Sequence, residues 1–139
     1  MDLSVGVRAL HVMAATLAVG IPVGLAFVLH ARPEPEVVEQ LVTPAERAQW
    51  AALAVLVATG VGNLAAFDGT FPAGHWSSIL YTKLGLVFAL LVISAVRTFF
   101  IAGMASGPAS HRARLERWYG LTAVVGLVIV ALAEVLAHG

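Results

Sequence analysis

Hydrophobic residues fall into four long, unbroken blocks, and short polar segments separate these blocks. The blocks cover residues about 5 to 30, 48 to 67, 79 to 101 and 117 to 137. Each is long enough to cross a hydrocarbon core of about 30 Å, which takes roughly 20 helical residues. A membrane β-barrel would instead show alternating segments of about ten residues. The pattern therefore predicts an all-α fold, an integral membrane four-helix bundle that forms a single domain over residues 1–139.

Polar segments rich in Pro and Gly connect the four blocks and leave both chain ends on the same side. We expect connections at Ala31 to Arg47, Asp68 to Ser78 and Gly103 to Glu116. Basic residues predominate at one end of the spans, at Arg32, Arg47, Arg97, Arg112, Arg114 and Arg117, against Arg8 and Lys83 at the other. The positive-inside rule then predicts a multi-pass protein of the inner (plasma) membrane with both termini outside.

Aromatic residues near the block ends suggest where the membrane interfaces lie, because Trp and Tyr prefer the headgroup level. Trp50, Trp118 and Tyr119 would mark one interface, and Trp76 and Tyr81 would mark the other.

Composition agrees with a membrane protein and excludes several classes of function. Hydrophobic residues make up 60% of the chain and charged residues 12%, with a mean hydropathy of +0.91. Eight basic residues balance eight acidic ones, so nothing favours nucleic acid as a partner, and membrane lipids are the expected surroundings. The absence of cysteine excludes disulfides, thiolate metal sites and iron–sulfur clusters. The apolar stretch near the N-terminus exceeds a signal-peptide core, so we interpret it as a retained helix.

Small residues indicate how the first helix packs. Gly20 and Gly24 have the four-residue spacing that lets helix backbones approach closely in lipid, and we expect this face to contact a neighbour in the bundle or in a homodimer. His11 and Pro22 lie on the opposite stripe, and Pro22 should bend the helix locally.

His11 is the most informative polar residue, because an ionisable group inside a span is costly and suggests a ligand or proton-handling role. The alternative is a neutral imidazole bonded to a carbonyl or hydroxyl of a neighbouring helix. Lys83 and Arg97 lie toward the two ends of the third span, where snorkelling explains them, although they could meet a substrate or propionate carboxylate. Asn63 and Thr59 suit interhelical hydrogen bonds, and His111 suits contact with anionic lipid.

Several further side chains are expected on the same membrane side as His11. They are Met13, His75, Glu134 and His138, with Met1 as another soft donor. Imidazole, carboxylate and thioether groups together could bind copper or zinc. Taken singly, each also fits a solvated interface residue. No Ser/His/Asp triad, phosphate-binding loop or HExxH motif occurs, so the sequence favours a non-enzymatic role.

Four segments resemble the copper resistance protein D (CopD) family along essentially the whole chain. The segment from Arg8 to Gly20 carries the Leu-His pair of its first helix, and Ala58 to Leu64 resembles its Thr-Gly-x-x-Asn segment. Leu80 to Val87 resembles its Lys-Leu entry to the third helix, and Leu115 to Gly120 the start of its last helix. Each motif is short, so the order of the four carries the specificity.

The resemblance implies a four-helix membrane core that handles copper, with His11 and Lys83 as the matching histidine and lysine. The related HemJ-type protoporphyrinogen oxidases share the Leu-His and Lys-Leu segments and are similar to haem-binding proteins. Members of both groups tend to carry a histidine in the second half of the third helix, which this chain lacks. The first hypothesis is copper binding or passage at the outer face. The second is a haem b protein, either an electron carrier or a HemJ-like porphyrin-oxidising enzyme, with His11 as axial ligand and Lys83 or Arg97 at the propionates. The third is a structural subunit.

Overall fold

The computed structural model describes residues 3–65 and 73–138, and all regular elements within those ranges are helical. Helix α1 spans Leu3–His30, α2 spans Pro35–Ala65, α3 spans His75–Ala102 and α4 spans Arg112–His138, with a short 3-10 helix, η1, at Pro108–His111. All four long helices are long and apolar enough to cross a membrane. The all-α four-helix prediction is confirmed, and these helices indicate a multi-pass membrane protein.

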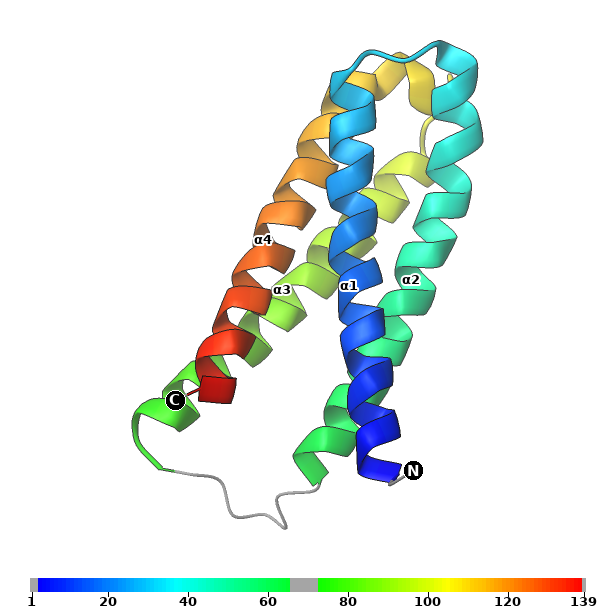
Figure 1. The fold of residues 1–139 in the computed structure, drawn as a ribbon. Helices are drawn as coiled ribbons and strands as arrows, with labels where there is room; N and C mark the ends of the chain where they lie inside the picture. The colour runs from blue at the N-terminus through cyan, green and yellow to red at the C-terminus, as the bar shows by residue number, and fades with distance from the viewer. Residues whose placement is uncertain (1–2, 66–72, 139) are drawn as a thin grey trace.

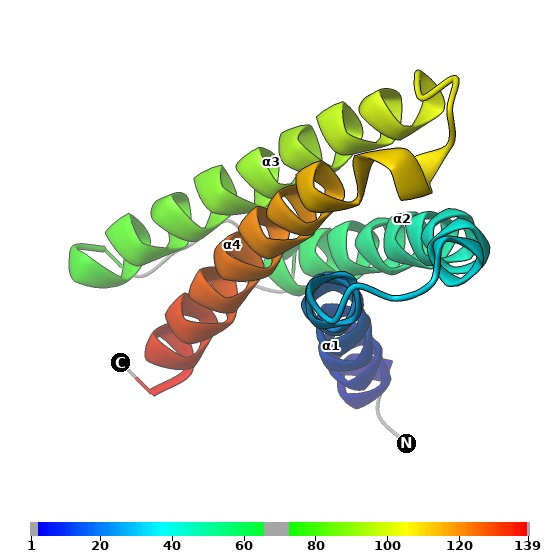
Figure 2. The same cartoon turned by 90° about the horizontal axis from the view of Figure 1, so that it is seen from above.

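The helices run up and down, so that α1 begins and α4 ends at the same end of the molecule (Figure 1). Helix α1 packs against both α2 and α4, and α4 packs against α3. Figure 2 shows α3 lying beside α4 on the side of the bundle away from α1. We call the end with the α1–α2 and α3–α4 connections the loop end, and the opposite one the terminal end.

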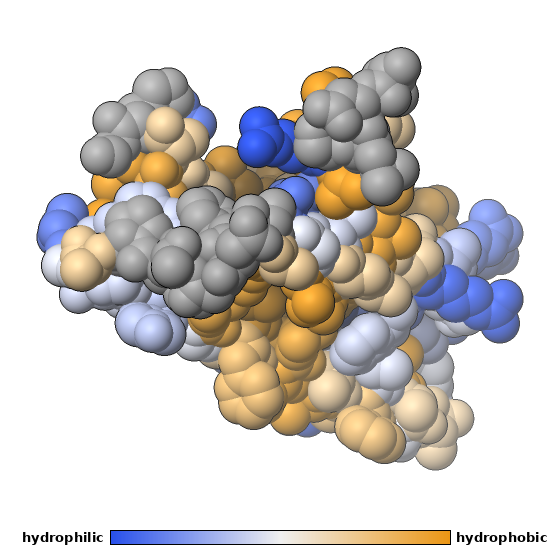
Figure 3. Space-filling model, turned by 90° about the horizontal axis from the view of Figure 1, so that it is seen from below, coloured by the Kyte–Doolittle hydropathy of each residue, from blue (hydrophilic) through white to orange (hydrophobic). Residues whose placement is uncertain are grey.

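Large apolar side chains point outward along the helices. Phe27, Phe88 and Phe99 are 73%, 68% and 79% exposed in the single chain. Hydrophobic side chains cover much of the surface in the view onto the terminal end (Figure 3). A surface of this kind suits contact with lipid and not with water.

Helix α2 is longer than expected, and the predicted connection from Ala31 to Arg47 is wrong. The connection ends at Glu34, and Pro35 occupies the first helical position, where its missing N–H costs nothing. Beyond it, Val38 and Val42 are buried one turn apart in a hydrophobic core with Leu25, Leu29, Leu115 and Tyr119. Tertiary packing thus keeps residues 35–47 helical despite Pro44.

The α3–α4 connection is also shorter than predicted, because residues 112–116 are already helical in α4. Gly107 adopts a positive φ of 82° before η1, and a Cβ there would lie 2.5 Å from Glu39 Oε1. The same Glu39 oxygen accepts a hydrogen bond of 3.0 Å from the Ala109 N–H. This close approach fastens the turn to α2. The expected Asp68 to Ser78 connection lies partly outside the described residues, and α3 already begins at His75.

The prediction that Gly20 and Gly24 contact a neighbour is wrong within the chain. Both glycines are exposed, and nothing would lie within 4 Å of a Cβ on either. The opposite stripe of α1 is buried instead, including Ala18 and Pro22. Helix α4 instead approaches α1 closely at Gly126, where a Cβ would lie 3.0 Å from Val19 Cγ2.

The two glycine positions give a matched test of this packing. Gly126→Leu is expected to destabilise the bundle by about 1–3 kcal/mol, because added methylenes must push α4 away from α1. Gly24→Leu should be neutral or slightly stabilising, because Leu favours a helix more than Gly does. Thermal unfolding in detergent, followed by circular dichroism, measures both. A larger loss for Gly24→Leu would show that its face is the packed one.

Candidate functional site

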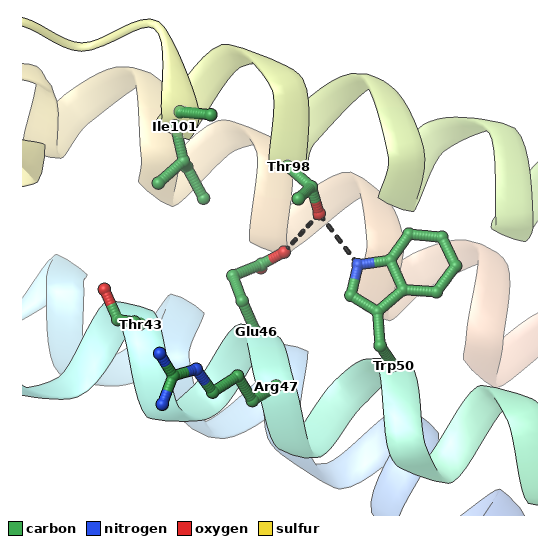
Figure 4. A pocket seen from close by; sticks show the side chains of 7 residues that line it. Thr43, Glu46, Arg47, Trp50, Thr98 and Ile101 are labelled. Carbon is green, nitrogen blue, oxygen red and sulfur yellow. Dashed lines mark hydrogen bonds between the residues drawn. The ribbon is translucent and has the colours of Figure 1, made fainter.

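Two clusters of polar side chains lie between the helices, one toward each end. The cluster near the loop end is centred on Glu46 of α2. Its Oε1 accepts hydrogen bonds from Arg97 Nε at 2.7 Å and from the Tyr119 hydroxyl at 2.6 Å. Its Oε2 lies 2.6 Å from Thr98 Oγ1, which in turn accepts a bond of 2.9 Å from Trp50 Nε1 (Figure 4). The carboxylate therefore joins α2, α3 and α4.

Arg97 is completely buried, at 0% exposure, and does not snorkel as predicted. Its Nη1 donates to Thr122 Oγ1 at 2.7 Å, and its guanidinium carbon lies 4.5 Å from the centre of the Tyr119 ring. Its ionic partner is Glu46, at 2.7 Å. Glu46 and Thr122 thus hold two of the guanidinium nitrogens, while the third, Nη2, is buried without a hydrogen-bond partner among the described residues.

Two aromatic residues expected at the membrane interface belong to the same cluster. Tyr119 is fully buried, and Trp50 is partly buried with its indole N–H bonded inside the bundle. Their polar atoms find protein partners and not the headgroups that the interface prediction assumed. Both residues therefore hold helices together.

The Glu46 cluster holds α2, α3 and α4 together in the half of the bundle near the loop end. Lipid chains are as apolar as Leu, so helix association depends on packing and on polar contacts between helices. Gln49 adds one such contact, because its Nε2 donates to the Ala18 carbonyl of α1 at 2.9 Å. The donors around Glu46 and the charge of Arg97 leave the carboxylate fully satisfied, which is typical of a structural connection.

The second cluster lies toward the terminal end and contains His11. His11 Nδ1 is 2.8 Å from Thr59 Oγ1 of α2. The Thr59 hydroxyl also lies 2.7 Å from the Val55 carbonyl, and when it donates its hydrogen there it accepts from the Nδ1–H of the imidazole. A neutral ring with its hydrogen on Nδ1 carries the lone pair on Nε2. The tautomer is thus the one that ligates iron or copper through Nε2.

Lys83 of α3 lies within electrostatic range of the His11 ring, and both side chains are partly buried. Gly60 lies behind the ring, where a Cβ would be 3.4 Å from His11 Cε1. Three helices therefore supply an anchored imidazole, a primary amine and a close backbone surface. The expected interhelical role of Thr59 is confirmed.

Among the described residues, the other candidate metal ligands do not form a group with His11. Met13 is 63% exposed on the lipid-facing surface, and His75 is exposed at the start of α3. Glu134 is exposed and engaged in an interaction of its own, while Met1 and the side chain of His138 lie outside the described residues. Within the described part of the chain, no three His, Cys, Asp or Glu residues form a group that could hold a metal ion.

His111, for which the sequence suggests contact with anionic lipid, lies at the loop end. Its ring packs edge-on against Phe100 at 5.9 Å between ring centres. It is far along the bundle from His11 and serves as a control for it.

Sequence reasoning missed Glu46, Thr98 and Thr122. Glu46 falls within the connection predicted from Ala31 to Arg47, but it follows Val38 and Val42 at four-residue spacing and precedes Gln49 by three. That spacing places all four on one helix face. This shared face indicates that the helix begins before Glu46 and that the Glu46 side chain is buried together with the valines.

Comparison of the chain with protein-family models, curated proteins and solved structures finds no match. Function therefore has to be argued from the two clusters. The Glu46 carboxylate has its hydrogen-bond partners within the bundle, although Nη2 of Arg97 has none among the described residues. In the His11 cluster, the imidazole contacts Thr59 and lies within electrostatic range of Lys83.

Proposed function

We propose that this membrane protein binds haem b, with His11 Nε2 as an axial ligand to the iron and Lys83 as the partner of a propionate. The observation that carries the proposal is the 2.8 Å contact between His11 Nδ1 and Thr59 Oγ1. With the Thr59 hydroxyl donating to the Val55 carbonyl, the imidazole hydrogen lies on Nδ1 and the lone pair on Nε2. Ligating histidines commonly donate their other N–H to an oxygen in this way. A bound haem would supply one-electron chemistry.

The chain's own residues would bind and orient the group. Thr59 would fix the tautomer and the orientation of the His11 ring. Gly60 has no side chain, so it leaves room for the ring. Lys83 would provide a positive charge near His11. A propionate inside the membrane needs such a partner, because an unpaired charge there is costly. The fit is one of donor chemistry, and it makes Lys83 the first candidate for the propionate, since the Arg97 guanidinium is fully buried and already paired with Glu46.

Copper is the second candidate, because the same Nε2 lone pair suits Cu(I) or Cu(II) and the sequence resembles the CopD family. Copper needs additional protein ligands, whereas haem brings four nitrogens of its own. Within the described residues, no three His, Cys, Asp or Glu side chains are grouped so that they could hold a metal ion. Haem therefore has the stronger support.

The experiment is a titration of haem into the purified apoprotein in detergent, followed by absorbance at the Soret band. Lys83→Met is expected to weaken haem affinity about tenfold, since a hydrogen bond to a charged group contributes about 1.5 kcal/mol. The Soret position should not change, because the iron ligand is retained. Arg8→Met, which removes the other cation expected at the terminal end, serves as the control. A wild-type chain that gives no saturable Soret band, or an affinity insensitive to Lys83→Met, would contradict the assignment.

The proposal also includes an orientation, with His11 toward the outside of the plasma membrane and both termini outside. In intact cells, a membrane-impermeant maleimide should label a cysteine at Ser77 and leave one at Ser110 unmodified. Ser77 is at the terminal end and Ser110 at the loop end. Preferential labelling at Ser110 would reverse the orientation.

A further inference from the structure

A hollow of about 440 Å³ lies between α2 and α3 near the loop end, apart from the His11 cluster. Figure 4 shows Arg47 and Thr43 on the α2 side, Thr98 and Ile101 on the α3 side, and Trp50 at one end. The hollow thus combines a cation and hydroxyl groups with an apolar wall. It is open on one side and faces outward from the bundle.

Charge at the hollow comes from Arg47. Its side chain is exposed and makes no ion pair within the described residues. Glu46 also lines the hollow, but Arg97 neutralises its charge and its two oxygens already accept three hydrogen bonds. The carboxylate therefore does not compete for Arg47, and the lining carries a net positive charge.

We infer that this hollow binds an anionic phospholipid, with the phosphate at Arg47 and Thr43 and an acyl chain along Trp50, Ile101 and Ala102. Basic pockets between transmembrane helices bind anionic headgroups in this way. The apolar wall is the feature that favours a lipid over a soluble phosphate, because a free anion gains nothing from Ile101 and Ala102. The inference is independent of haem or copper at His11.

A second hollow at the same end has the same chemistry. It measures about 260 Å³ and is lined by Arg114, Arg117, Trp118 and Leu121 of α4. Arginine, tryptophan and an aliphatic side chain therefore recur at two places where the basic residues of the chain are concentrated. This recurrence supports a loop end that lies in the leaflet richer in anionic lipid.

The test uses the full chain in detergent with equal amounts of phosphatidylglycerol and phosphatidylcholine, and native mass spectrometry counts the lipids retained. Arg47→Gln should weaken retention of one phosphatidylglycerol about fivefold, as expected for one basic residue at a membrane surface. Arg32→Gln, an exposed change at the same end, should have no effect. Ala102→Trp, which fills the hollow without changing charge, should reduce retention of both lipids.

Inorganic phosphate in excess should not displace the lipid. Displacement by phosphate alone would overturn the inference and indicate a site for a soluble anion. Equal losses for Arg47→Gln and Arg32→Gln, or unchanged retention in Arg47→Gln, would also overturn it. Melting temperatures confirm that each variant is folded, and Arg47→Gln decides the matter if Ala102→Trp unfolds.

Discussion

Glu46→Gln is expected to destabilise the bundle by about 3–5 kcal/mol, because it leaves the buried Arg97 guanidinium without a compensating charge. The matched control is Glu116→Gln, the same chemical change at a partly exposed ion pair with Arg112 and His30. Its effect should be much smaller, since water and salt screen exposed pairs. Unfolding in mixed micelles, followed by circular dichroism, compares the two free energies of unfolding.

A second variant separates the lost ion pair from general damage to the core. Replacing Arg97 by Met in the Glu46→Gln background removes the uncompensated charge, so the double variant should be more stable than Glu46→Gln alone. Equal losses for Glu46→Gln and Glu116→Gln would show that the Glu46 cluster does not hold the loop half together. A strictly additive double variant would show the same.

The four spans were predictable because lipid permits only structures that satisfy their own backbone groups, and unbroken apolar runs of this length leave helices as the solution. The start of α2 was not, since Pro35, Pro44 and the acidic residues between 34 and 39 suggest a loop. What keeps that segment helical is contact with α1 and α4, through Val38 and Val42. Such tertiary contacts override local composition.

Partners distant in sequence explain the other errors. Glu46 and Arg97 are paired in space, but a lone arginine near a helix end has the same local pattern whether it snorkels or is buried. Likewise, the Gly20/Gly24 spacing identifies a smooth helix face without saying what lies against it. His11 was recognisable because an imidazole inside a span must find a partner, and Thr59 is that partner.

His11→Ala is expected to abolish stable haem binding, because it removes the proposed axial ligand, whereas His111→Ala should leave occupancy unchanged. The two substitutions delete the same side chain at opposite ends of the bundle, so a general effect of removing an imidazole is controlled. Thr59→Val, which removes the acceptor for Nδ1–H, should weaken binding about 10- to 100-fold, as loss of an outer partner commonly does. Melting temperatures of all three variants check that each bundle is intact.

The most direct measurement is the absorption spectrum and metal content of wild-type and His11→Ala protein, purified without chelator from cells supplied with haem precursor and copper. The account predicts a Soret band and iron in the wild type, and loss of both in His11→Ala. Colourless wild-type protein that carries copper, and loses it in His11→Ala, would replace haem with the second candidate. Wild-type protein with neither ligand, or occupancy unchanged by His11→Ala, would contradict the account and leave His11 as a packing residue bonded to Thr59.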